Sequence, residues 1–184
     1  FPRFSLFSAA RAIGKPKMLK EQLVRLKYTF RKDPYFTYRY LMDLSEATNI
    51  KAHFYFVTGK HSYDVQQYLT NRHFRVLVRE IRRRGHIIGL HPGYYSYNDG
   101  EALRSEKQLI EQYVEGRVVE GRQHYLRFHI PYTWRILNDQ GIKMDSTLGY
   151  PDKTGFRCGI CQEFPVFDII TRRKLTLIER PLIA

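Results

Sequence analysis

Cysteine is scarce in this chain of 184 residues, which contains only Cys158 and Cys161. Two thiols cannot complete the four-ligand site that structural zinc requires. Their CxxC spacing is that of a thioredoxin-like redox motif, but such a motif opens a helix after a strand, and this pair lies among glycines. We therefore interpret the pair as a loop with two thiols, or with one local disulfide.

Long hydrophobic runs are also missing. No apolar run approaches the about 20 residues that a membrane-spanning helix needs, so no transmembrane segment is predicted. The chain begins at Phe1 without a charged-apolar-small secretory pattern. Its hydrophobic fraction of 43% and aromatic fraction of 15% are typical of a globular protein rather than a disordered one. The length predicts a single domain over residues 1–184.

Acidic residues are few: 18 Asp and Glu stand against 31 Lys and Arg, a net charge of +13. Such a surplus can indicate binding to nucleic acid, an anionic membrane surface or an anionic substrate. The densest cluster is Arg79 with Arg82, Arg83 and Arg84, which we interpret as a solvated helix end whose cations suit the helix dipole. We therefore expect no nucleic-acid partner, and keep a basic nucleic-acid-binding domain as an alternative that a steep salt dependence would reveal.

Strand and helix signals alternate along the chain, which predicts an α/β fold with parallel strands in a sheet or barrel. In such folds, ligands bind at the carboxyl ends of the strands. The predicted helices cover residues 16–31, a segment starting at Asp33-Pro34, and residues 74–84, 101–114 and 134–138. The predicted strands cover residues 52–57, 87–90, 118–126, 142–148 and 174–178.

Three predicted strand ends carry polar side chains. The first ends on His91, a later one brings Arg122 and His124, and the next brings Asp145. Neutral imidazoles and carboxylates are ligands for zinc and similar divalent ions. An arginine can hold a carboxylate base in its ionised form. These residues are therefore the candidates for a metal or acid-base site.

Each candidate has a simpler interpretation. His91 could be bonded to a backbone carbonyl, and Arg122 could be a structural ion-pair partner of Asp145. His124 could merely alternate across the sheet, and Asp145 could cap the loop that follows it.

Five short runs, taken in order, resemble the polysaccharide deacetylase superfamily, the family 4 carbohydrate esterases. The resemblance spans roughly residues 30 to 182 and implies a partial, distorted β/α barrel of the deacetylase type. The runs are Gly85–Tyr94, Arg122–Phe128, Thr133–Leu137, Asp145–Tyr150 and Gly155–Cys161.

Members of this family remove acetyl groups from glycans with a divalent metal, commonly zinc, that one aspartate and two histidines hold. The resemblance therefore implies a polysaccharide or glycan substrate and a zinc cofactor. His91 matches the first histidine of the family's HxxxH motif, but Tyr95 stands where the second should be. A phenol is a poor zinc ligand at neutral pH, so we expect His124 to supply the missing imidazole. Arg122 matches the arginine that orients the base, with Arg127 as the alternative.

The resemblance also implies parts that this sequence does not contain. The family's first motif, with the base and the ligand aspartate, would precede Phe1, and its last motif would follow Ala184. We therefore expect a truncated member of the family whose residues 1–184 show little hydrolysis alone. Tyr94 and Tyr95 are candidates for stacking on sugar rings, which also suits the alternative of a catalytically silent carbohydrate-binding domain.

Overall fold

The chain divides into two compact units, Phe1–Ile50 and Lys51–Ala184. In the first unit, helix α3 spans Tyr38–Ala47, which confirms this part of the predicted second helix. The helix predicted over residues 16–31 lies largely outside the described residues, and the single domain over residues 1–184 stays a prediction. The computed structural model describes residues 15–18, 20, 36–64 and 67–182.

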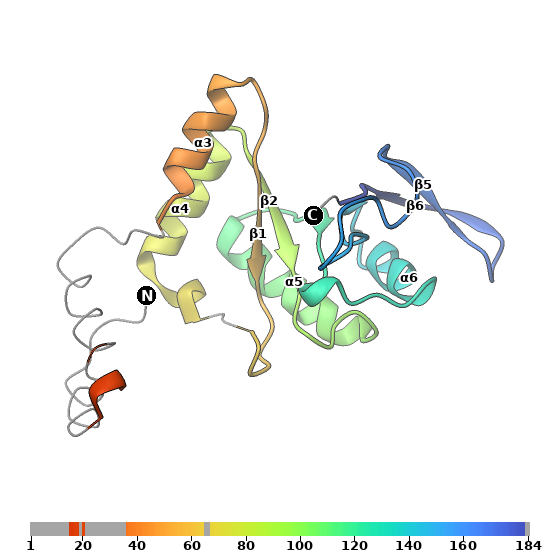
Figure 1. The fold of residues 1–184 in the computed structure, drawn as a ribbon, viewed down its shortest axis with the longest axis horizontal. Helices are drawn as coiled ribbons and strands as arrows, with labels where there is room; N and C mark the ends of the chain where they lie inside the picture. The colour runs from red at the N-terminus through yellow and green to blue at the C-terminus, as the bar shows by residue number, and fades with distance from the viewer. Residues whose placement is uncertain (1–14, 19, 21–35, 65–66, 183–184) are drawn as a thin grey trace. The chain divides into compact units, whose positions relative to one another are not determined.

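The second unit is built on one sheet of six strands in the order β1-β2-β3-β4-β6-β5. Figure 1 shows β1 beside β2 and β5 beside β6. The first five strands in this order pair in parallel, and only β5 runs antiparallel to β6. The parallel strands therefore bring their carboxyl ends to one edge of the sheet. The strands are β1 (His53–Val57), β2 (Ile87–His91), β3 (Glu120–Gly121), β4 (Met144–Asp145), β5 (Phe164–Asp168) and β6 (Arg173–Glu179).

Helices connect the parallel strands of this unit. Helices α4 and α5 contact β2, and α6 contacts β5 and β6. Short 3-10 turns lie between these elements, one before α4 and one directly after β3. The elements are α4 (Arg72–Arg83), α5 (Gly100–Val114), α6 (Tyr132–Asp139), η1 (Gln67–Thr70) and η2 (His124–Leu126).

The helix ends follow local sequence signals. The Asn71 side chain accepts a hydrogen bond from the His73 amide at 3.0 Å, and Asp99 caps the start of α5 in the same way. Gly85 and Gly141, with φ of 77° and 75°, follow α4 and α6, where a left-handed residue ends a helix. The predicted helices over residues 74–84, 101–114 and 134–138 are therefore confirmed to within two residues at each end.

The two faces of the sheet differ in chemistry. Side chains alternate between the faces of a strand, and paired positions of neighbouring strands share a face. Phe56, Leu90 and Leu177 lie on one face, where they are at most 3% exposed. The helices cover this face, and their apolar side chains complete the core. The opposite face carries polar, half-buried side chains, including His91 and Arg122.

The strand predictions over residues 118–126 and 142–148 are wrong in length, because each segment forms only a two-residue strand. After β3 the chain turns into η2, where Tyr125 has a positive φ of 57° that no strand could contain. Strand β5 was not predicted. It contains Pro165, which is tolerated here because β5 lies at the edge of the sheet. The α/β class with mostly parallel strands is confirmed.

Candidate functional site

The candidate site lies where β2, β3 and β4 end. His91 is the last residue of β2 and is paired with Val57 of β1. The Arg122 amide donates to the Leu90 carbonyl at 2.9 Å, and the Ser146 amide donates to the Gly121 carbonyl at 3.0 Å. These bonds continue the parallel ladder by one residue, so His91, Arg122 and Ser146 stand side by side on the polar face.

The His91 imidazole is fixed and neutral. Its Nδ1 lies 2.7 Å from the Arg122 carbonyl oxygen. A carbonyl only accepts, so Nδ1 carries the proton and Nε2 keeps its lone pair. Burial, together with the charge of His124, lowers the pKa of His91 to about 4. The predicted backbone hydrogen bond is thus present, and it leaves Nε2 suited to bind a metal.

His124 lies beside His91, with ring centroids 4.9 Å apart. It stands in η2, not on a strand, so it does not alternate across the sheet. Its Nδ1 is 2.7 Å from Oδ1 of Asp64, whose side chain is only 1% exposed. The other oxygen of Asp64 accepts the His61 amide at 2.8 Å. Among the described residues, none hydrogen-bonds Nε2 of His91 or of His124.

Asp64 is the functional residue that sequence reasoning missed. A carboxylate or carbonyl on the second nitrogen is the usual partner of a metal-ligating histidine. Asp64 follows β1 in the loop after Gly59, so it stands at the same carboxyl edge as the other candidates. That position after a strand was the available signal, but the pairing with His124, 60 residues away, is visible only in three dimensions.

The Arg122 side chain is held in place by neutral groups. Its Nε donates to the Ser146 carbonyl at 3.1 Å, and its guanidinium lies 4.8 Å from the centre of the Tyr55 ring. The Tyr55 hydroxyl is in turn 2.9 Å from Ser146 Oγ and 3.2 Å from Glu120. No described residue forms a hydrogen bond or ion pair with the terminal nitrogens of Arg122, so they can bind an anion.

Asp145 does not share the face of His91 and Arg122. It pairs with Gly121 and Glu179, and its side chain is fully buried in the helix-covered core. It accepts the Thr147 hydroxyl at 2.6 Å, so it organises the loop that follows, and it forms no ion pair with Arg122. Its predicted catalytic role stays a prediction.

Tyr94 and Tyr95 follow β2 in the loop next to the histidine pair. The Arg127 guanidinium lies 4.0 Å from the centre of the half-buried Tyr94 ring and donates to the Tyr94 carbonyl at 2.8 Å. Arg127 also donates to the Tyr97 hydroxyl at 3.1 Å. These bonds engage Arg127 with the tyrosine loop rather than with the histidines. Tyr95 is 55% exposed and is free to contact a ligand.

A second polar group lies deeper on the same face of the sheet. His53 Nδ1 is 2.6 Å from a Glu120 oxygen, and Arg180 approaches the same oxygen to 3.8 Å. Arg180 also pairs with Glu163 at 2.6 Å. The ion pairs lower the pKa of Glu120 despite its burial. The structure thus makes His53 part of a network with Glu120 and Arg180.

Two imidazoles alone do not make a complete metal site. Within residues 15–18, 20, 36–64 and 67–182, no group of three or more His, Cys, Asp or Glu side chains could hold a metal ion. His91 and His124 fit two positions of a zinc site, and the predicted zinc stays a prediction. Cys158 and Cys161 are both free thiols rather than a disulfide.

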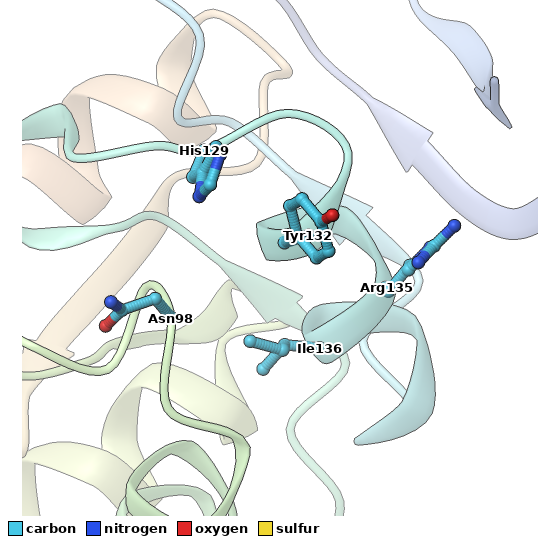
Figure 2. A pocket seen from close by; sticks show the side chains of 5 residues that line it. All are labelled: Asn98, His129, Tyr132, Arg135 and Ile136. Atoms are coloured by element: carbon cyan, nitrogen blue, oxygen red, sulfur yellow. The ribbon is translucent and has the colours of Figure 1, made fainter. Parts of the chain in front are cut away.

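A separate hollow of about 450 Å³ lies at the start of α6 (Figure 2). None of the predicted site residues lines it. Arg135 extends away from Asn98 in Figure 2, and its guanidinium is bonded to Asp168. The charge of Arg135 is therefore paired with Asp168 and is not available to a ligand in the hollow. Its lining residues are Asn98, His129, Tyr132, Arg135 and Ile136.

No helix among the described residues is both long and apolar enough to cross a membrane.

Comparisons with known proteins support the fold. No family model matches the sequence, and no curated protein matches it. A crystal structure of a candidate polysaccharide deacetylase from Mycobacterium smegmatis is similar, with a TM-score of 0.57 and 16% sequence identity. The similarity covers 94% of this chain and 54% of that one, so this chain spans about half the length of its neighbour. The predicted fold class, an α/β fold of the deacetylase barrel type, is confirmed.

Proposed function

We propose that this chain forms the metal-binding part of a polysaccharide deacetylase, which hydrolyses acetyl groups on a glycan. One observation carries the proposal: His91 and His124 lie side by side at a strand-end edge, each with Nδ1 bonded to oxygen. With Nδ1 occupied in this way, Nε2 is the ring nitrogen left to meet a cation. The shared fold with a candidate deacetylase supports the same function.

In this proposal, the residues of the chain bind and orient. His91 and His124 would hold a zinc ion, which when bound lowers the pKa of a water molecule and polarises the acetyl carbonyl. Asp64 keeps the Nδ1 proton of His124 in place, and so fixes the tautomer that can bind metal. The terminal nitrogens of Arg122 hold an anionic group of the site, either the carboxylate base or the substrate.

A catalytically silent carbohydrate-binding domain is the second candidate. It is favoured by Tyr95 in place of the second HxxxH histidine, and by the lack of a third metal ligand among the described residues. Such a domain would bind glycans without holding zinc. Metal content therefore separates the two candidates.

The test is titration of the metal-free chain with Zn²⁺ in a calorimeter. We expect about one zinc per chain, and loss of that binding in both His91→Ala and His124→Ala. His73→Ala, at an exposed histidine of α4, is the matched control and should bind zinc as the native chain does. Stoichiometric zinc retained by His124→Ala would refute the assignment. Acetate release from an acetylated chitooligosaccharide then measures hydrolysis directly.

A further inference from the structure

Four tyrosines gather in the loops beyond the strand ends, and we call them the tyrosine platform. Tyr63 follows β1, Tyr94 and Tyr95 follow β2, and Tyr125 follows β3. The Tyr94 ring centroid is 5.0 Å from those of Tyr63 and Tyr95, and 5.7 Å from that of Tyr125. The platform therefore joins three separate loops of the carboxyl edge into one surface.

The platform borders the histidine pair. The ring centroid of Tyr125 is 4.6 Å from that of His124, which itself is 4.9 Å from that of His91. A ligand group that reaches the imidazoles can thus continue directly onto an aromatic surface.

Three of these rings remain exposed although burial would be favourable. Tyr63 and Tyr95 are each 55% exposed and Tyr125 is 62% exposed. Tyr125 and Leu126 have positive φ values of 57° and 51°, a conformation that costs free energy in residues other than glycine. Grouped, exposed aromatic rings on a strained turn are typical of a binding surface.

The platform is rigid before any ligand arrives. The Arg127 guanidinium lies 4.0 Å from the Tyr94 ring centre and 4.2 Å from that of Tyr97. The His61 ring also stacks on Tyr94, with centroids 5.4 Å apart and an angle of 21°. A surface fixed in this way loses little conformational entropy when it binds.

The chemistry of the platform favours a sugar polymer. Tyrosine offers an apolar face for the C–H face of a pyranose and a hydroxyl for its polar edge. The rings cross at 56° (Tyr63 and Tyr94), 78° (Tyr94 and Tyr125) and 89° (Tyr94 and Tyr95), so they do not form the successive parallel faces that stacked bases use. Arg127 is engaged by tyrosine rings and a carbonyl, so it is not available to bind phosphates.

From these observations we propose that the tyrosine platform binds the sugar units next to the one that reaches the histidine pair. This inference rests on the proposed function for the statement that the sugar unit at the histidine pair is the one that reacts. The binding of neighbouring sugar units by the platform is a separate claim.

The test is calorimetric binding of chitotetraose and of N-acetylglucosamine to the native chain. We expect the tetramer to bind at least tenfold more tightly than the monomer, with loss of about tenfold in affinity for each ring removed. Tyr63→Ala and Tyr125→Asn remove the rings, and asparagine tolerates the left-handed conformation at position 125. Tyr125→Phe keeps the ring and should retain binding. Tyr132→Ala, at an exposed tyrosine of the α6 hollow, is the control and should also bind normally.

Equal affinity for monomer and tetramer would overturn the inference, as would unchanged tetramer binding in folded Tyr63→Ala and Tyr125→Asn. Tighter binding of a single-stranded oligonucleotide than of chitotetraose would also overturn it. The proposed function fails separately: chains that bind no zinc and release no acetate, but still prefer the tetramer, would be silent glycan binders with this platform.

Discussion

At the scale of single residues, the hydrogen bond made by Nδ1 of each imidazole determines whether Nε2 can bind a cation. The Arg122 carbonyl holds Nδ1 of His91, and Asp64 holds Nδ1 of His124. The lowered pKa of His91, about 4, keeps that ring neutral at neutral pH, because burial disfavours the imidazolium. His91 is therefore prepared to bind a cation without first losing a proton, and Asp64 fixes the orientation of the His124 ring.

Asp64→Asn tests this orientation directly. An amide cannot supply the negative charge that makes His124 more basic, and its NH₂ group would face the His61 amide that Asp64 now accepts. We expect the zinc affinity to fall by about 10- to 100-fold. The measurement is zinc titration, with far-UV circular dichroism to establish folding.

The matched control is Asp152→Asn, at an exposed aspartate in the loop after β4. It should leave zinc affinity unchanged. Equal affinity of folded Asp64→Asn and the native chain would contradict the role given to Asp64.

At the scale of elements, a buried pair of carboxyl groups joins β4 to β6. Asp145 and Glu179 are paired across these strands and are both fully buried. Both Glu179 oxygens accept N–H bonds at 3.0 Å, from the Trp134 indole and the Leu148 amide. Asp145 Oδ2 has no hydrogen-bond partner among the described residues. Burial is the main cause that raises the pKa of both groups.

The pair makes stability depend on pH. Because both folded pKa values are raised above their ordinary values of 3.8 and 4.5, the folded chain holds more protons than the unfolded chain above that range. Stability from the pair is therefore complete at about pH 4 and is lost as the pH rises through the raised pKa values. Each retained proton contributes up to about 1.4 kcal/mol per pH unit.

Asp145→Asn should remove much of this dependence, because the amide does not titrate and leaves Glu179 without a charged neighbour. We expect the variant to gain stability relative to the native chain between pH 6 and 9, while Asp145→Ala is less stable throughout. Urea unfolding at several pH values measures this difference.

At the scale of the whole molecule, the net charge of +13 is the dominant feature. It can strengthen association with any polyanion, but the rings of the tyrosine platform are uncharged and bind through contact. Salt therefore separates the two modes of binding.

We expect DNA to bind weakly and to lose affinity steeply between about 50 and 200 mM salt, whereas chitotetraose affinity should change little over that range. Fluorescence anisotropy for DNA and calorimetry for the sugar measure both. Tight DNA binding that persists near 200 mM salt would instead favour the nucleic-acid-binding alternative.

Much of the fold could be predicted from the sequence. Helices α4, α5 and α6 follow apolar periodicity, and α4 and α6 end just before Gly85 and Gly141, signals that act within a few residues. The short strands β3 and β4 were predicted too long, because their pairing depends on neighbours far along the chain. Edge strand β5 was missed because Pro165 weakens its local signal.

The sequence by itself determined the α/β alternation and the candidate residues His91, Arg122 and His124 near strand ends, because these depend on local periodicity and chain order. Only the tertiary structure decided that His124 meets His91, that Asp64 is its partner, and that Asp145 faces the core instead. The physical reason is that side-chain direction at a strand end depends on register. One residue of shift moves a side chain from one face of the sheet to the other.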